Sequence, residues 1–173
     1  MSIRLRPLRD EDHDRLFAFE QDPAAVRMAA FTRADPSDRT AFDAHQRRIS
    51  RDPDAMQWAI EREGIFVGTV GSFMLEGHRE VTYWVDPAHW GEGIAGAALL
   101  AFLSVETTRP LFARVAEHNL GSARVLERAG FSEIGRETSY AHGVGSEVVE
   151  RIFRLGPTPD SRPTRRTPSS ADA

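Results

Sequence analysis

The order of apolar and polar positions predicts a strand at the start of the chain and helices directly after it. Residues 3–8 (IRLRPL) alternate between apolar and polar side chains, as a half-buried strand does. Residues 10–51 instead show cap-forming acids ahead of helically spaced apolar residues, and X-Pro pairs at 22–23 and 35–36 interrupt this pattern. We therefore expect one strand followed by a helical region.

Three β-rich runs follow one another in the middle of the chain. They cover residues 56–63 (MQWAIERE), 65–75 (IFVGTVGSFML) and 79–86 (REVTYWVD), and turn residues separate them at Gly64 and at 76–78 (EGH). Strands joined by such short turns are typical of an antiparallel meander. We place these three strands at the centre of a sheet.

The second half of the chain is predicted to combine helices and strands. The expected elements are a helix over 94–108, a strand over 111–117, a helix over 122–130 and two closing strands over 131–140 and 147–155. The tail 157–173 is rich in proline, serine and arginine and has almost no apolar residues, so we expect it to be disordered. The sequence thus predicts one domain over residues 1–156.

Composition and charge exclude several classes of protein. The 173 residues include no cysteine, which excludes disulfides, thiolate zinc sites and thiol nucleophiles, and we predict no metal site. The net charge of −4 gives no basic surface for nucleic acid. The chain has no apolar run of about 18 residues, and its first residues are charged where a signal peptide is apolar. We expect a cytoplasmic protein that binds neither nucleic acid nor membrane.

Residues 91–96 (GEGIAG) form a glycine-rich turn ahead of an apolar helix, and such a turn offers backbone N–H groups to an anion. The glycine spacing is that of the dinucleotide fingerprint, and Glu117 could be the acid that holds the ribose. However, five residues including Pro87 separate Val85 from Gly91, the preceding strand belongs to a meander, and no second mononucleotide-binding half follows. These features favour another phosphate ligand, with an NAD oxidoreductase as the alternative.

Two longer segments resemble a known family. Residues 83–95 (YWVDPAHWGEGIA) and 119–131 (NLGSARVLERAGF) are similar to two motifs of the GNAT superfamily of acyl-CoA-dependent N-acetyltransferases, in the branch that includes RimJ and RimL. The order of elements fits this family from about residue 3 to residue 155. The resemblance implies a GNAT-like α/β fold, with a mixed, largely antiparallel seven-stranded sheet flanked by about four helices, and acetyl-CoA as co-substrate.

The resemblance also implies where acetyl-CoA binds. The strand over 79–86 would pair with the pantetheine amides where it splays away from the strand over 111–117, and a Val85 N–H would reach the thioester oxygen. Trp90 stands where the general family pattern has Gln or Arg, which leaves the backbone donors intact. Asn119 would bond the pantetheine arm or a water, or would simply end a strand. The implied cofactor-binding residues are Val85, Trp90, Gly91, Gly93, Ile94, Ala95, Gly96, Asn119 and Ser122.

Acetyl transfer requires a neutral amine, and without a cysteine we expect direct attack on acetyl-CoA in a ternary complex. Glu80 lies where many GNAT enzymes carry the general-base glutamate, although it could be a solvated residue near a turn. His142 falls in the loop where the acceptor site lies in this fold, and an imidazole titrates near neutral pH. The alternative for His142 is an ordinary exposed loop histidine.

The proton donor to the departing thiolate is less clearly marked. Many family members use a tyrosine at the position of Leu126, so that role is vacant in this chain. Within the RimJ/RimL branch the serine of the Asn-x-x-Ser motif is the proposed donor, which implies Ser122. Ser122 could equally be the N-cap of the helix predicted over 122–130.

The predicted function is therefore an acetyl-CoA-dependent N-acetyltransferase that acts on a primary amine. The acceptor would be a protein N-terminus, or a small amine such as an antibiotic or a polyamine. A binding module that retains acyl-CoA affinity without turnover is a further alternative, since Leu126 replaces the tyrosine. A homodimer is possible, but no segment of the sequence specifies an interface.

Overall fold

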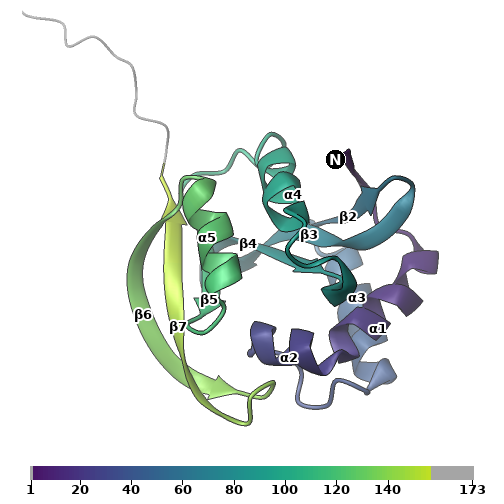
Figure 1. Ribbon diagram of the computed structural model, residues 1–173, viewed down its shortest axis with the longest axis horizontal. Helices are drawn as coiled ribbons and strands as arrows, with labels where there is room; N and C mark the ends of the chain where they lie inside the picture. Colours follow the sequence, from purple (N-terminus) through teal and green to yellow (C-terminus); the bar gives the residue numbers. More distant parts are fainter. Residues whose placement is uncertain (1, 157–173) are drawn as a thin grey trace, which may run out of the picture.

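Seven strands form one sheet in the order β1-β2-β3-β4-β5-β7-β6, and the computed structural model describes residues 2–156 (Figure 1). All neighbouring strands are antiparallel except β4 and β5, which are parallel, so the predicted fold class is confirmed. The tail predicted to be disordered lies outside the described residues. The strands are β1 (Ile3–Pro7), β2 (Met56–Arg62), β3 (Ile65–Leu75), β4 (His78–Val85), β5 (Leu111–Ala116), β6 (Ser132–Ala141) and β7 (Ser146–Leu155).

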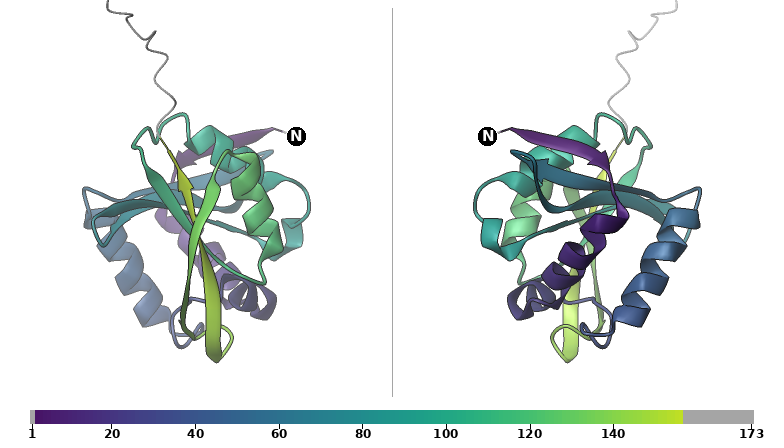
Figure 2. Two further views of the ribbon diagram at one scale, coloured as in Figure 1. Left: turned by 90° about the vertical axis from the view of Figure 1, so that its left-hand side faces the viewer. Right: turned by 90° about the vertical axis from the view of Figure 1, so that its right-hand side faces the viewer.

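Helices cover both faces of the sheet (Figures 1 and 2). Helices α1 and α3 pack on one face around Leu16 and Phe42, and α4 and α5 pack on the other around Leu99 and Leu126. Among residues 2–156, no helix has the length and apolar character needed to span a bilayer. The helices are η1 (Asp10–Asp12), α1 (His13–Gln21), α2 (Pro23–Ala29), α3 (Arg39–Arg51), η2 (Pro87–His89), α4 (Ile94–Phe102) and α5 (Leu120–Arg128).

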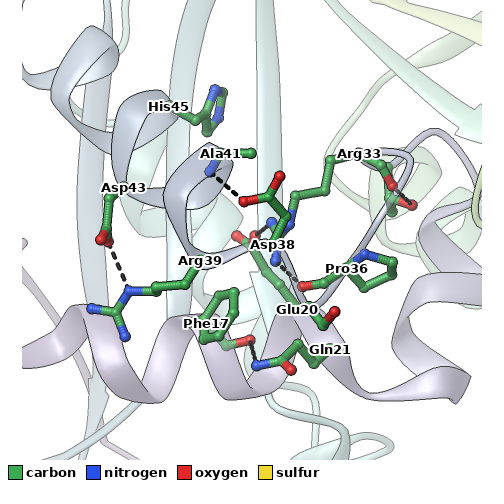
Figure 3. A network of polar contacts seen from close by, with 12 residues as sticks. Phe17, Glu20, Gln21, Arg33, Pro36, Asp38, Arg39, Ala41, Asp43 and His45 are labelled. Atoms are coloured by element: carbon green, nitrogen blue, oxygen red, sulfur yellow. Dashed lines mark hydrogen bonds and ion pairs between the residues drawn. The ribbon is translucent and has the colours of Figure 1, made fainter.

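A group of arginines and aromatic rings joins α1 to α3 and to the segment between α2 and α3 (Figure 3). The Arg33 guanidinium lies 5.4 Å from the centroid of the Phe17 ring, and the Arg39 guanidinium lies 5.2 Å from the same centroid. Arg33 also pairs with Glu20 at 2.5 Å, and Arg39 pairs with Asp43 at 2.8 Å. The two cation–π contacts share the Phe17 ring of α1, and Arg39 also pairs with Asp14 of α1 at 2.7 Å, so these contacts hold α1 and α3 together on their face of the sheet.

The alternation of side chains along β4 decides which of them reach each layer of helices. Val81, Tyr83 and Val85 pack in the core that lies under α4 and α5, whereas Trp84 packs against the core under α1 and α3. Successive side chains of a strand point to opposite faces, so Glu80 shares the face of Trp84. Strand β4 therefore presents different chemistry to each side of the sheet.

Strands β4 and β5 are paired at one position only, Glu80 opposite Phe112, and they separate from there toward their carboxyl ends. On its other side β4 stays paired with β3, where the Asp86 N–H donates to the Val67 carbonyl at 2.9 Å. Backbone groups of an antiparallel pair alternate between facing the partner and facing away. The N–H and C=O of Val85 therefore point into the gap between β4 and β5, and the predicted splay is confirmed.

The helix predicted over 94–108 ends earlier, with α4 closing at Phe102. The reason lies in Glu106, which is only 2% exposed and turns back into the protein. Its carboxylate accepts hydrogen bonds from the Ser72 hydroxyl at 2.6 Å, from Arg79 Nε at 2.8 Å and from the Thr108 N–H at 2.9 Å. Continuing the helix would break these bonds to a buried charge, so the segment after Phe102 is irregular.

Glu106→Gln is expected to destabilise the protein at neutral pH by roughly 3 kcal/mol. Burial raises the pKa of Glu106, but the hydrogen bonds from Ser72, Thr108 and Arg79 outweigh it and lower the pKa from 4.5 to about 2. A folded-state pKa below the unfolded value stabilises the protein above about pH 4.5, and this contribution is lost as the pH falls toward 2. Urea unfolding at several pH values measures it; the prediction fails if wild type and variant lose stability in parallel over this range.

Candidate active site

The glycine-rich loop leads from β4 into α4 through two residues in the left-handed region. Gly91 has φ +80° and Gly93, the N-cap of α4, has φ +78°, which only glycine adopts without strain. The first intrahelical bond runs from Ala97 N–H to the Gly93 carbonyl. The N–H groups of Ile94, Ala95 and Gly96 precede that bond and have no partner within the helix, so the loop offers several donors to one anion.

Trp90 closes the start of this loop. Its indole N–H donates to the Val85 carbonyl at 2.9 Å, although the side chain is 41% exposed. The Trp90 side chain therefore ties the loop to the end of β4. The Val85 carbonyl faces the gap and accepts this bond, while the Val85 N–H, the predicted donor to the thioester oxygen, points into the same gap. The register between β3 and β4 is continuous at Val85, so no bulge orients this N–H.

Asn119 and Ser122 lie at the start of α5, and the alternative role predicted for Ser122, the N-cap, is wrong. Asn119, rather than Ser122, is the N-cap, and its Oδ1 accepts from the Ser122 N–H at 3.1 Å. The Asn119 amide also donates to the Met28 carbonyl at 3.2 Å, beside a contact of 2.7 Å from His118 Nε2 to the Arg27 carbonyl. The helix begins two residues earlier than expected because asparagine caps as well as serine does. Asn119 thus links α5 to the carboxyl end of α2.

The Ser122 hydroxyl contacts a tyrosine that sequence reasoning missed. Tyr83 Oη lies 2.7 Å from Ser122 Oγ and 3.2 Å from the Ser122 carbonyl oxygen. Burial raises the pKa of Tyr83 to about 12, although its hydrogen bond with Ser122 opposes this, so the phenol stays protonated at neutral pH. The alternation of side chains along β4 could have placed Tyr83 on the side of the sheet that α5 covers. Its contact with Ser122, however, depends on how α5 packs against β4 in the fold.

Glu80 lies at the closed end of the gap, on the face of the sheet opposite Tyr83. It is 5% exposed, and Arg114 Nε donates to its carboxylate at 3.0 Å. The other end of the Arg114 guanidinium contacts Glu137 at 2.8 Å and Glu150 at 3.4 Å. Burial raises the pKa of Glu150, Arg114 opposes the shift, and the neighbouring Glu80 and Glu137 add to it. One guanidinium thus contacts three carboxylates. Because Glu80 is buried, the alternative that it is a solvated residue near a turn is wrong.

His142 is exposed in the turn between β6 and β7. Its ring lies 5.3 Å from that of Tyr140, and the adjacent Gly143 N–H donates to the Ala30 carbonyl at 2.8 Å, which docks the turn on the end of α2. Phe112 of β5 is paired with Glu80 on one side and with Arg154 of β7 on the other. The start of β7, which follows the turn that holds His142, is eight residues away from Arg154. This is roughly 26 Å along the strand, so the structure does not bring His142 to Glu80.

The segment β4-α4-β5 is a parallel crossover unit, although β4 is also the last strand of the antiparallel meander. It differs from a dinucleotide-binding unit because its two strands part after one paired position and every other neighbouring pair in the sheet is antiparallel. Residues 2–156 contain no group of three His, Cys, Asp or Glu side chains able to hold a metal ion. The candidate site therefore combines a loop with several backbone N–H groups free of partners within the helix, a gap between two strands and the buried carboxylate of Glu80.

Several solved structures that are similar to this chain are N-acetyltransferases. The chain is similar to RimJ from Mycobacterium smegmatis in complex with CoA-disulfide, at 23% identity and TM-score 0.73, covering 89% of this chain and 81% of that chain. It is similar to spermidine N-acetyltransferase from Vibrio cholerae in complex with CoA and spermine, at 16% identity and TM-score 0.73, covering 87% and 94%. It is also similar to RimL, the ribosomal L7/L12 alpha-N-protein acetyltransferase solved with CoA, at 16% identity and TM-score 0.73, covering 88% of this chain and 93% of that chain.

Identities this low show a shared fold alone, and no curated protein sequence matches the chain significantly. The family model of the acetyltransferase (GNAT) domain, however, matches residues 2–132, which is most of the chain and includes β1 to β5, the glycine-rich loop and α5. This match overturns the NAD oxidoreductase alternative. The chain belongs to the GNAT acetyltransferases.

Proposed function

We propose that this acetyltransferase moves the acetyl group of acetyl-CoA to a primary amine by direct attack in a ternary complex. The observation that carries the proposal is the junction of two features: the unpaired N–H groups at the start of α4, and the gap where β4 parts from β5. The first suits a pyrophosphate. The second leaves backbone donors and acceptors of β4 free for the amides of a pantetheine chain.

The residues of this chain fit acetyl-CoA in three places. Gly91 and Gly93 bring the main chain close to the phosphates, and the N–H groups of residues 94–96 would bind them. The gap-facing backbone of Tyr83 and Val85 would pair with the pantetheine arm. Asn119 retains one N–H and one lone pair beyond its contacts with Met28 and Ser122, so its predicted bond to this arm stays a prediction.

Glu80 is the proposed general base. A protein α-amine has a pKa of about 8 and is mostly protonated at neutral pH, so the acceptor must lose a proton before it attacks. The Glu80 carboxylate lies at the closed end of the gap, and Arg114 fixes its orientation through one oxygen atom. The second oxygen has no hydrogen bond to residues 2–156 and can accept the proton directly or through a water. His142 stays the alternative base.

Ser122 is the proposed hydrogen-bond donor to the departing thiolate. The Tyr83 phenol can donate to Ser122 Oγ at 2.7 Å, which frees the serine proton to point toward the sulfur. With a pKa of about 12, Tyr83 orients the serine rather than giving up its own proton at neutral pH. Acetyl-CoA supplies the activated acyl group, and this pair would stabilise negative charge on sulfur.

The site supports a primary amine as the acceptor, but it does not distinguish a protein N-terminus from a small amine. RimL is named for acetylation of a protein N-terminus and the Vibrio cholerae enzyme for acetylation of spermidine. We favour an α-amine, because it asks least of the base. A small amine is the alternative, as is a module that binds acyl-CoA without turnover, since Leu126 is buried in the core and offers no hydroxyl. The cytoplasmic location and the homodimer stay predictions.

Thermal unfolding with acetyl-CoA, CoA, NADH and ATP tests the proposed co-substrate. Acetyl-CoA or CoA at 100 times its dissociation constant is expected to stabilise the protein by about 2.7 kcal/mol, with no comparable shift from NADH. A panel of N-terminal peptides and spermidine, assayed for released CoA, then tests turnover. Absence of any shift with CoA contradicts the proposal, and a shift without turnover on any amine supports the binding module.

A further inference from the structure

The proposed phosphate-binding loop contains an acid at its centre. Glu92 lies between Gly91 and Gly93, and its side chain is 37% exposed. A carboxylate there would repel the phosphates that the surrounding N–H groups attract. The loop can bind a pyrophosphate well only if this negative charge is neutralised or turned away.

Two basic side chains from neighbouring elements hold Glu92. Arg62, the last residue of β2, forms an ion pair with Glu92 Oε2, and His89 Nδ1 lies 3.3 Å from Glu92 Oε1. The Arg62 side chain is 27% exposed, and Glu92 is its ion-pair partner within residues 2–156. Both partners line one hollow together with residues of the turn between β2 and β3, and those strands lie on the other side of β4 from β5.

The contacts also shape a hollow of about 270 Å³ beside the loop, lined by Arg62, Glu63, Ile65, Val67, His89 and Glu92. Arg62 Nε is buried and has no hydrogen-bond partner among residues 2–156, and Nη1 is the guanidinium nitrogen that pairs with Glu92. The arginine is therefore committed to the loop acid, and the proposed phosphate site lies beyond it, at the N–H groups of α4.

We propose that Arg62 is a positioning residue that draws the Glu92 carboxylate toward the β2–β3 turn and cancels its charge, so that the loop accepts the CoA pyrophosphate. This inference rests on the proposed function, because it presumes that CoA binds at this loop. It concerns an interaction between two residues of the protein, and it does not require Arg62 to touch the ligand. The two charges then act on CoA binding as a unit.

A double-mutant cycle on CoA binding, measured by calorimetry, tests the proposal. Arg62→Ala is expected to raise the Kd for CoA about tenfold, whereas Glu92→Gln should leave the Kd unchanged or lower it. The decisive variant is the double mutant, for which we expect a Kd within about twofold of that of Glu92→Gln. Equal losses from Arg62→Ala in both backgrounds would mean that Arg62 binds the phosphates itself, and would overturn the proposal.

Three controls separate this effect from damage to the fold. Arg62→Lys keeps the charge and should restore most of the affinity. Arg9→Ala removes the same charge from an exposed pair with Glu11 and should not change the Kd. The defect of Arg62→Ala should also shrink in 1 M salt. If wild type binds CoA but Arg62→Ala binds it equally well, only this inference fails; if wild type does not bind CoA, the proposed function fails with it.

Discussion

Gly93→Val is expected to raise the Kd for acetyl-CoA at least 30-fold, a loss of about 2 kcal/mol of binding free energy. Gly93 caps α4 at φ +78°, and a β-branched residue in this left-handed region costs roughly 1–2 kcal/mol. The loop can relieve that strain only by moving, which turns the N–H groups of Ile94 to Gly96 away from a common point. The new side chain would also occupy space that the phosphates need. Calorimetric titration with CoA measures the change without an acceptor.

Gly77→Val is the matched control for this variant. Gly77 lies in the turn between β3 and β4 at φ +82°, and no atom lies within 4 Å of a Cβ built on it. A valine at this position therefore imposes the same backbone strain as Gly93→Val, but at the opposite end of β4. We expect Gly77→Val to lose some stability while its Kd for CoA stays that of wild type. Equal affinities for the two variants would show that residues 91–96 do not bind the phosphates.

The strands and the glycine-rich loop could be predicted from local patterns. Runs rich in β-branched and aromatic residues, separated by turn residues, identify β2, β3 and β4, and the short turns force neighbouring strands to be antiparallel. Gly91 and Gly93 could be singled out because a left-handed turn into a helix requires residues without a Cβ. In each case the deciding interactions lie within a few residues along the chain.

The contacts between distant segments could not be predicted in this way. Helix propensity alone extends α4 past Phe102, but a buried network between Glu106 and the strands β3 and β4 ends it there. The pair of Tyr83 with Ser122 joins residues 39 positions apart, and that of Arg114 with Glu80 joins residues 34 apart. The first pair depends on how α5 packs on the sheet and the second on the pairing of β4 with β5, and a local pattern carries no information about either.

Glu80→Gln is expected to lower turnover about 100-fold at neutral pH with little change in the Kd for CoA. The amide keeps the shape of the side chain but accepts no proton, so the variant depends on acceptor that is already neutral. Below the amine pKa of about 8, that fraction falls tenfold for each pH unit. The ratio of wild-type to variant turnover should therefore grow as the pH decreases. The pH-rate profiles of both proteins, with the best amine of the panel, measure this ratio.

Glu137→Gln separates catalysis from a change in the electrostatics of Arg114. Glu137 contacts the same guanidinium as Glu80 at 2.8 Å, but its side chain is 57% exposed and belongs to β6. Its loss removes one negative charge beside Arg114 while the Glu80 carboxylate stays in place. We expect Glu137→Gln to retain turnover within a few-fold of wild type. If it lost as much as Glu80→Gln, the effect would come from the ion-pair cluster rather than from a base.

The same profiles decide between Glu80 and His142. A wild-type profile in the Glu80→Gln variant would exclude Glu80 as the base and leave the imidazole as the next candidate. His142→Gln would then have to change the pH-rate profile. We expect the opposite outcome, because Glu80 lies at the closed end of the gap between β4 and β5, whereas His142 lies in the β6–β7 turn, on α2. Proton transfer requires contact directly or through one water, and the fixed position of Glu80 beside the proposed acetyl-CoA site suits such contact.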